Sequence, residues 1–244
     1  MTFTSGNLGK SIKKRIKKFL FRLQPYSHLF SQGGEDAILY GIFYKKIKKG
    51  TTGFFVDVGA YHPFIHSNTY LFYLKGWRGI NIDANPGSMK EFKKKRPRDI
   101  NLELGISDKN GYSTFYVLHE DSTMNTFSAA NLQEHNMLQA VEKKKKIETR
   151  TLESVLDEYS EEFTEIDLFS IDVEGFDQVV LESNNWSKYR PKVIVVEMNC
   201  SDIHDVMKHE ISLFLYKKEY KIVAKNLIRK DLASVFFVSN DFDY

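Results

Sequence analysis

The stretch of residues 53–86 constrains the fold of this chain most strongly, because it has the pattern of a complete βαβ unit. Two short runs rich in β-branched and aromatic residues, 53–58 and 79–83, enclose a segment, 68–75, with apolar residues at helical spacing. The two runs end at Asp57 and Asp83. Ligands of parallel sheets bind beyond the carboxyl ends of the strands. The segment therefore predicts a nucleoside site between neighbouring strand ends.

The turn after the first run narrows the choice of nucleoside. A dinucleotide site normally has G-x-G-x-x-G, because the backbone must approach a pyrophosphate closely. Here a single glycine, Gly59, is followed by bulky residues and a proline, and the acidic Asp57 disfavours phosphate. Asp83 follows about 20 residues later, where a carboxylate accepts hydrogen bonds from ribose hydroxyls. S-adenosylmethionine fits this pattern. The alternative interpretations are an NAD-dependent sugar oxidoreductase and a non-catalytic scaffold that binds a nucleoside.

Composition sets the broad class. The 244 residues are 42% hydrophobic and 27% charged with a net charge of +3, which predicts a globular domain and gives no reason to expect nucleic acid as a partner. Cys200 is the only cysteine, so an intrachain disulfide and a cysteine-based zinc site are excluded. No run approaches the ~18 apolar residues of a membrane span. We expect a cytoplasmic protein.

Residues 1–30 form an expected amino-terminal extension. Within it, residues 11–23 place apolar side chains on one face of a helix and lysines and arginines on the other. Such a helix packs on its own domain, packs on a partner subunit in a homo-oligomer, or lies peripherally on an anionic membrane surface. We favour packing over membrane contact.

The rest of the chain, residues 31–244, alternates expected strands and helices. Residues 119–150 interrupt the alternation, and we interpret them as an insertion that covers the strand ends, with the lysine run 143–146 at its exposed margin. The pattern predicts an α/β doubly wound sheet whose last two strands form an antiparallel pair. The further strands are expected at 100–106, 112–118, 166–171, 192–198, 221–225 and 233–239, and the further helices at 35–43, 86–96, 129–141, 151–159 and 206–216.

Five segments, in this order, resemble the FkbM-type S-adenosylmethionine-dependent methyltransferase family. They are SQGGEDAIL (31–39), residues 55–89 beginning FVDVGAYHPF, INLELGISDKNG (100–111), MNTFS (124–128) and residues 166–197 beginning IDLFSIDVEGFD. The resemblance implies a class I methyltransferase (Rossmann-like) fold with a seven-stranded sheet and an antiparallel last strand. It further implies methyl transfer, usually to oxygen, with sugars, nucleotide sugars and polyketide-type hydroxyls as the substrates of the family. Of these we expect a sugar or a nucleotide-linked sugar of glycan biosynthesis.

The resemblance also assigns the cofactor site. Its members come from the loop before the first strand and from the carboxyl ends of the strands. Asp57 and Gly59 would border the methionine moiety, Asp83 would bind the ribose hydroxyls beside Asn85, and Asp172 would lie next to the methyl group together with Glu174. The remaining members are Ser107 and Asp108 near the adenine, and Gln32, Glu35 and Asp36, which would close over the cofactor.

A sugar hydroxyl is a weak acid, so methyl transfer needs a general base or a divalent cation that lowers the hydroxyl pKa. Asp172 with Glu197 or Asn199, at the ends of adjacent strands, forms an oxygen-rich set that suits Mg²⁺ or another divalent cation. The candidate catalytic residues are Asp172, His204 and His62. A single histidine in a loop is more often structural than catalytic, so the sequence does not decide which of these three residues is the base.

Overall fold

A computed structural model describes residues 29–119 and 122–244. The predicted amphipathic segment 11–23 therefore lies outside the described residues. In the described ranges no helix is both long enough and apolar enough to cross a membrane.

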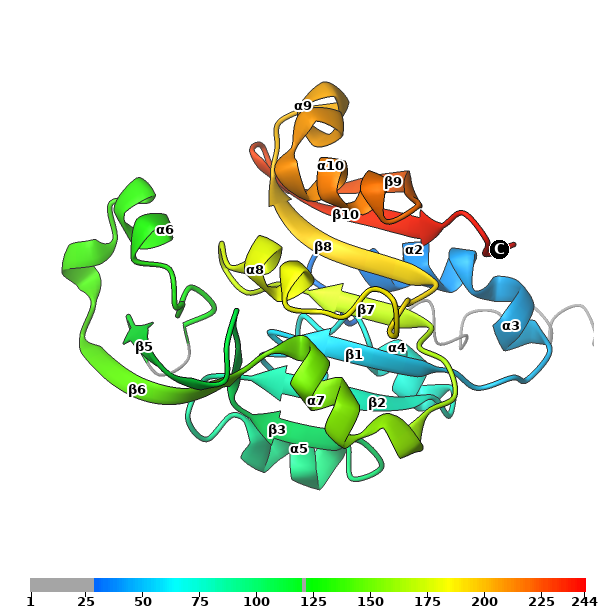
Figure 1. Ribbon diagram of the computed structural model, residues 1–244, viewed down its shortest axis with the longest axis horizontal. Helices are drawn as coiled ribbons and strands as arrows, with labels where there is room; N and C mark the ends of the chain where they lie inside the picture. Colours follow the sequence, from blue (N-terminus) through cyan, green and yellow to red (C-terminus); the bar gives the residue numbers. More distant parts are fainter. Residues whose placement is uncertain (1–28, 120–121) are drawn as a thin grey trace, which may run out of the picture.

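A seven-stranded sheet forms the centre of the molecule (Figure 1). Its order is β3-β2-β1-β7-β8-β10-β9, and all neighbours are parallel except β10, which is antiparallel to both β8 and β9. This confirms the doubly wound sheet with an antiparallel last strand. The strands are β1 (Phe54–Val58), β2 (Arg78–Asp83), β3 (Ile100–Glu103), β7 (Leu168–Ile171), β8 (Val193–Asn199), β9 (Tyr220–Arg229) and β10 (Leu232–Ser239).

Helices cover both faces of the sheet. On one face α7 (Leu152–Glu158), α8 (Asp177–Glu182), α9 (Ile203–Lys208) and α10 (Glu210–Lys217) share a buried cluster with Val56. On the other face α2 (Glu35–Ile42) and α4 (Tyr70–Leu74) pack with Phe55, and α5 (Met89–Lys95) lies on the same side, where Arg96 stacks on the Phe55 ring. The short α3 (Tyr44–Lys48) follows α2. Because successive residues of a strand point to opposite faces, the alternation of Phe55 and Val56 fixes the face of every residue in β1.

A second, three-stranded sheet has the order β4-β6-β5 and lies with α6 (Ala129–Glu134) beyond the carboxyl ends of the parallel strands (Figure 1). The single strand expected at 100–106 is thus two strands, because the chain leaves the main sheet after β3. The lysine run is also strand and not merely an exposed margin, since it pairs with β5 and two of its ammonium groups lie over tyrosine rings. The strands are β4 (Gly105–Ile106), β5 (Gly111–Val117) and β6 (Lys143–Arg150).

Two boundaries near the carboxyl terminus differ from the expectation. The helix expected at 206–216 is two helices, because His209 has extended backbone and its imidazole accepts a hydrogen bond from Ile211 N, capping α10. The β9–β10 pair is longer than expected, since the polar Asn226 continues the strand and donates through its side chain to Gly33 O at 2.8 Å. The sheet edge thereby anchors the loop before α2.

Candidate active site

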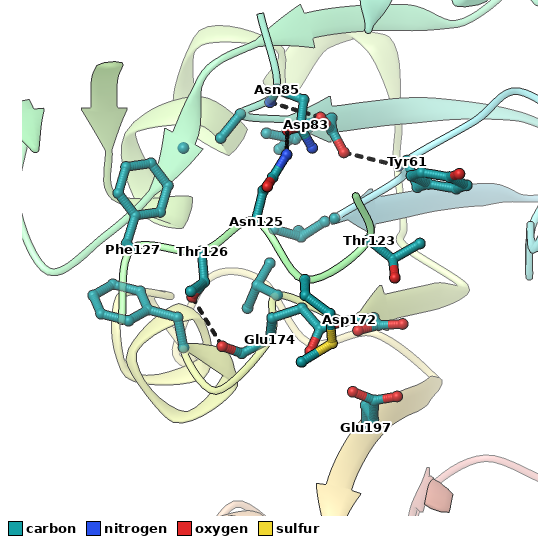
Figure 2. A pocket seen from close by; sticks show the side chains of 18 of the residues that line it. Tyr61, Asp83, Asn85, Thr123, Asn125, Thr126, Phe127, Asp172, Glu174 and Glu197 are labelled. Atoms are coloured by element: carbon teal, nitrogen blue, oxygen red, sulfur yellow. Dashed lines mark hydrogen bonds between the residues drawn. The ribbon is translucent and has the colours of Figure 1, made fainter. Parts of the chain in front are cut away.

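A cavity of about 250 Å³ opens at the carboxyl ends of β1, β2 and β7. Figure 2 shows its two polar ends, with Asp83 and Asn85 at one and Asp172, Glu174 and Glu197 at the other. The segment 123–127, which we call the strap, runs between the two ends. The cavity lies where the sequence predicts a nucleoside site.

The turn after β1 is held tightly between its neighbours. Gly59 has a φ of 81°, and a Cβ there would lie 1.7 Å from the Asp172 carbonyl oxygen, so only glycine fits. Its N–H donates to Ile82 O at 2.9 Å, which joins the turn to β2. Tyr61 and His66 also have positive φ values, 53° and 55°, and both line the cavity. Such backbone costs about 1–3 kcal/mol per residue and concentrates at functional sites.

Asp83 ends β2 and points its carboxylate at the turn. Its Oδ2 accepts a hydrogen bond from Tyr61 N at 2.9 Å, and its Oδ1 accepts one from Asn85 N at 2.8 Å. Burial raises the pKa of Asp83, whereas the two N–H groups oppose this by favouring the charged form. Each carboxylate oxygen keeps a second lone pair. Asp83 is thus a fixed acceptor for two further hydroxyl groups.

The strap is tied at both ends of the cavity. The Asn125 side chain donates to Asn85 Oδ1 at 2.7 Å and accepts from Leu118 N at 2.8 Å. The next residue, Thr126, donates through Oγ1 to the Glu174 carbonyl at 2.9 Å. The sequence predicts a cover in this region but does not assign its residues to the site. The available signal is the short polar MNTFS segment between apolar runs.

An apolar wall lies next to Asp83. Leu104 and Ile106 come from the β3–β4 segment, and Phe115 packs on Phe127 with ring centroids 4.7 Å apart. A Cβ on Gly105 would lie 2.4 Å from the Phe127 ring, so this glycine admits the aromatic side chain. Planar apolar surfaces of this kind suit a nucleobase. The sequence interpretation did not single out these aromatic residues.

Three carboxyl groups, Asp172, Glu174 and Glu197, form the other end, and we call them the carboxylate trio. One oxygen of each lies within 4.8 Å of the others. Burial, followed by repulsion from neighbouring carboxylates, raises the pKa of Glu197 to about 8 and places that of Asp172 well above its ordinary value. The pKa of Glu174 is raised to about 7 by burial and by Asp177. Protons are therefore shared within the trio near neutral pH.

The predicted loop residues divide between the cavity and its support. Gln32 lines the cavity. Glu35 is buried and accepts from Ser234 Oγ at 3.0 Å, and Asp36 is buried and accepts from Phe30 N at 2.8 Å. Both acidic side chains hold the loop against the domain and do not line the cavity. Their position supports a role in placing Gln32.

Asp57 does not line the cavity either. It lies on the Phe55 face of β1, where it accepts from Thr69 Oγ1 at 2.6 Å, and Thr69 in turn accepts from Arg96 at 3.0 Å. Asp57 therefore belongs to a buried polar network beneath α4 and α5. The family resemblance implies a place for Asp57 beside the methionine moiety, but the alternation of side chains in β1 turns it to the Phe55 face.

The remaining predicted residues lie outside the first cavity. His62 Nδ1 accepts from Ile65 N at 3.1 Å, and its Nε2 is 3.4 Å from Glu91 on α5. His204 is exposed in the first turn of α9, and Ser107 Oγ donates to Asp108 at 3.0 Å beyond the apolar wall. Asn199 is exposed and lines a neighbouring cavity rather than joining the trio. In its place Glu174 provides the third carboxyl group.

Comparison with protein families identifies the class of enzyme. The model of the methyltransferase FkbM domain matches residues 57–222, which include the β1 turn, Asp83, the strap and the whole trio. The chain belongs to the FkbM methyltransferase family. It is an S-adenosylmethionine-dependent methyltransferase.

Solved structures show only remote similarity to this methyltransferase. A Burkholderia thailandensis 1,6-didemethyltoxoflavin-N1-methyltransferase with bound S-adenosylhomocysteine has 10% identity and a TM-score of 0.45, with 99% of this chain and 93% of that chain covered. Aeropyrum pernix fibrillarin with bound S-adenosyl-L-methionine has 12% identity and a TM-score of 0.43, with 83% and 73% covered. Among curated proteins, none matches the chain. No residue assignment rests on these similarities.

Proposed function

We propose that this methyltransferase binds S-adenosylmethionine between Asp83 and the carboxylate trio and methylates a hydroxyl group of a sugar, free or nucleotide-linked. The observation that supports this most strongly is the pairing of a ribose acceptor at one end of the cavity with a cluster of carboxyl groups at the other. The sugar is the acceptor class that the family resemblance implies.

The lining of the cavity fits this cofactor. Its ionisable side chains are four carboxyl groups, those of Asp83 and the trio, together with Tyr61, His66 and one arginine, Arg229, so acidic groups outnumber basic ones. A sulfonium and an ammonium group are favoured by such a lining, whereas a pyrophosphate is not. Asp83 would hold the ribose hydroxyls, and the wall that contains Phe115 and Phe127 would hold the adenine.

The trio is our candidate for the proton acceptor. When bound, S-adenosylmethionine supplies an electrophilic methyl group, so that the sulfur–methyl bond breaks as the oxygen–methyl bond forms. The acceptor hydroxyl then has to lose its proton, and a base works best when its pKa is near the operating pH. Glu174 and Glu197, with pKa values near 7 and 8, meet this condition. Neither His62 nor His204 lies at this position.

A divalent cation is a second candidate for the same place. The trio offers hard oxygen ligands from three side chains, which is the donor set that Mg²⁺ prefers. A bound cation would lower the pKa of the acceptor hydroxyl. Turnover measured in EDTA decides between the two candidates. Loss of turnover with recovery in Mg²⁺ or Mn²⁺ supports the cation, and full turnover in EDTA leaves the trio acting as a base alone.

The reaction itself is tested by incubating the protein with S-adenosylmethionine and a panel of free and nucleoside-diphosphate sugars. Mass spectrometry should detect a methyl-sized gain in one sugar with wild type, and no gain with Asp172→Asn. Binding of S-adenosylhomocysteine without any methylated sugar would contradict the sugar assignment. Equal gains with wild type and the variant would contradict the role of the trio.

A further inference from the structure

A second cavity of about 250 Å³ adjoins the first. It lies among α6, the loop before α8, the end of β8 and the start of α10. The two cavities share Glu174, Glu197, Arg229 and Leu232. Two members of the carboxylate trio, Glu174 and Glu197, therefore lie at the junction, so a molecule in the second cavity reaches carboxyl groups that also line the first.

Acidic side chains outnumber basic ones in the lining of the second cavity. Arg229 is its only lysine or arginine, and its guanidinium lies 3.5 Å from Asp231. His209 accepts from Ile211 N, and burial lowers its pKa, so it is neutral at pH 7. The other ionisable side chains that line it are His135 and five carboxyl groups, those of Glu134, Glu174, Asp177, Glu197 and Glu210.

Not all of these carboxyl groups are available to a ligand. Asp177 accepts from Val173 N and Gly175 N, each at 3.2 Å, and so holds the loop that carries Glu174. Glu134 and Glu210 are exposed on opposite sides of the cavity, at the end of α6 and the start of α10. These two, together with Glu174 and Glu197, remain to bind a molecule in the cavity.

Buried acceptor atoms without donors provide an independent observation. Asn131, which lines the cavity, is 8% exposed, and its Oδ1 has no hydrogen-bond partner among the described residues. Gln178 also lines the cavity, and its Oε1 likewise has no hydrogen-bond partner among the described residues, since only its amide nitrogen is engaged, with Glu182. Unpaired buried acceptors are costly, so such atoms call for a donor from a ligand. The cavity thus offers buried acceptor atoms together with the exposed carboxyl groups of Glu134 and Glu210.

We propose that the second cavity is the acceptor subsite and that it takes a sugar unit bearing an ammonium group, an amino sugar, with no phosphate on that unit. This deepens the proposed function and rests on it. Hydroxyl and ammonium groups donate hydrogen bonds to Asn131 and to Glu134 and Glu210, and one hydroxyl meets the trio at the junction. A phosphate on that unit would lie among the acidic side chains of the lining. Its only arginine, Arg229, already lies 3.5 Å from Asp231.

The test compares glucosamine, methyl glucoside and glucose 6-phosphate as acceptors, with S-adenosylhomocysteine release as the readout. For wild type we expect kcat/KM to be highest with glucosamine and at least about tenfold lower with glucose 6-phosphate, since like charges in a partly buried site repel strongly. In the double variant Glu134→Lys, Glu210→Lys the preference for glucosamine should fall about tenfold, with S-adenosylhomocysteine affinity unchanged. Glu161→Lys, an exposed charge reversal remote from both cavities, should leave the preference as in wild type.

Saturation-transfer NMR with S-adenosylhomocysteine present separates failure of this inference from failure of the proposed reaction. Wild type could show saturation transfer to glucosamine that the double variant loses, while neither protein methylates any sugar. That result would overturn the proposed reaction but support the subsite. A preference for glucose 6-phosphate, or a glucosamine preference that the double variant retains, would overturn the subsite assignment. Glucosamine that neither binds nor reacts would overturn it as well.

Discussion

The two ends of the cofactor cavity contain the same residue type in the same structural position, yet their chemistry differs. Asp83 closes β2 and Asp172 follows β7, and these strands flank β1 on either side. Asp83 receives two backbone N–H groups, whereas Asp172 faces Glu174 and Glu197. Burial raises the pKa of both carboxyl groups.

The neighbours decide what each aspartate can do. Burial raises the pKa of Asp83, but two backbone N–H groups fix its carboxyl oxygens in place as hydrogen-bond acceptors. Nearby carboxylates disfavour the charged form of Asp172, so the trio shares protons and can take one from an acceptor. The strand position thus sets where the carboxyl group is, and the surrounding loops set whether it binds or exchanges a proton.

The largest expected effect is on turnover at the trio. Asp172→Asn removes a carboxylate from the proton-accepting cluster with little change in shape, and we expect kcat to fall by about 10²–10⁴-fold, the usual range for a general base. Affinity for S-adenosylhomocysteine, measured by calorimetry, should change by less than about threefold, since the ribose acceptor is untouched. A variant with wild-type kcat would show that the trio is not the proton acceptor.

The next effect is on binding at the opposite end. Asp83→Ala removes the acceptor for both ribose hydroxyls, and hydrogen bonds to a charged group contribute about 1.5–3 kcal/mol each. We expect affinity for S-adenosylhomocysteine to fall at least about 100-fold. A thermal melt of the variant without ligand checks that the domain still folds. Unchanged affinity in a folded variant would refute the ribose assignment.

A smaller effect is expected at the strap, which joins the two ends. Asn125→Ala removes the bond to Asn85 and the bond from Leu118 N, each contributing about 1 kcal/mol. We expect cofactor affinity to fall about five- to tenfold, with a similar fall in kcat/KM. Affinity that matches wild type would mean that the strap covers the site without shaping it.

The smallest effect is expected at His62, which belongs to neither end of the cavity. His62→Asn retains a side-chain acceptor for the N–H of Ile65 and should leave kcat within about twofold of wild type, because the ring does not line the cavity. The measurement is a steady-state assay of S-adenosylhomocysteine release. A large loss would restore His62 as a candidate base.

The sequence predicts the sheet and one end of the site well, for physical reasons. Strands buried on both faces give continuous apolar runs. The polar residue that ends such a run must lie at the carboxyl end of its strand, as Asp83 and Asp172 do. Asp57, which the family resemblance places beside the methionine moiety, lies in a buried network with Thr69, because the two-residue alternation of β1 turns it to the Phe55 face. That alternation was available in the sequence.

Other parts of the site depend on tertiary contacts that no local pattern records. The strap has no periodicity, so neither Asn125 nor Thr126 could be assigned a partner. The family resemblance places Glu174 beside Asp172, but its φ of 53° is a conformation that the sequence does not indicate for a glutamate. Asn199, two residues after Glu197, was expected as a metal ligand beside Asp172, but it is exposed and lines the second cavity.

The central claim is that one cofactor extends from Asp83 to the carboxylate trio, and a crystal structure with S-adenosylhomocysteine tests it most directly. We predict that both ribose hydroxyls lie within hydrogen-bond distance of the Asp83 carboxylate, with the sulfur turned toward Asp172. A ribose bound elsewhere, or a sulfur turned away from the trio, would contradict the account.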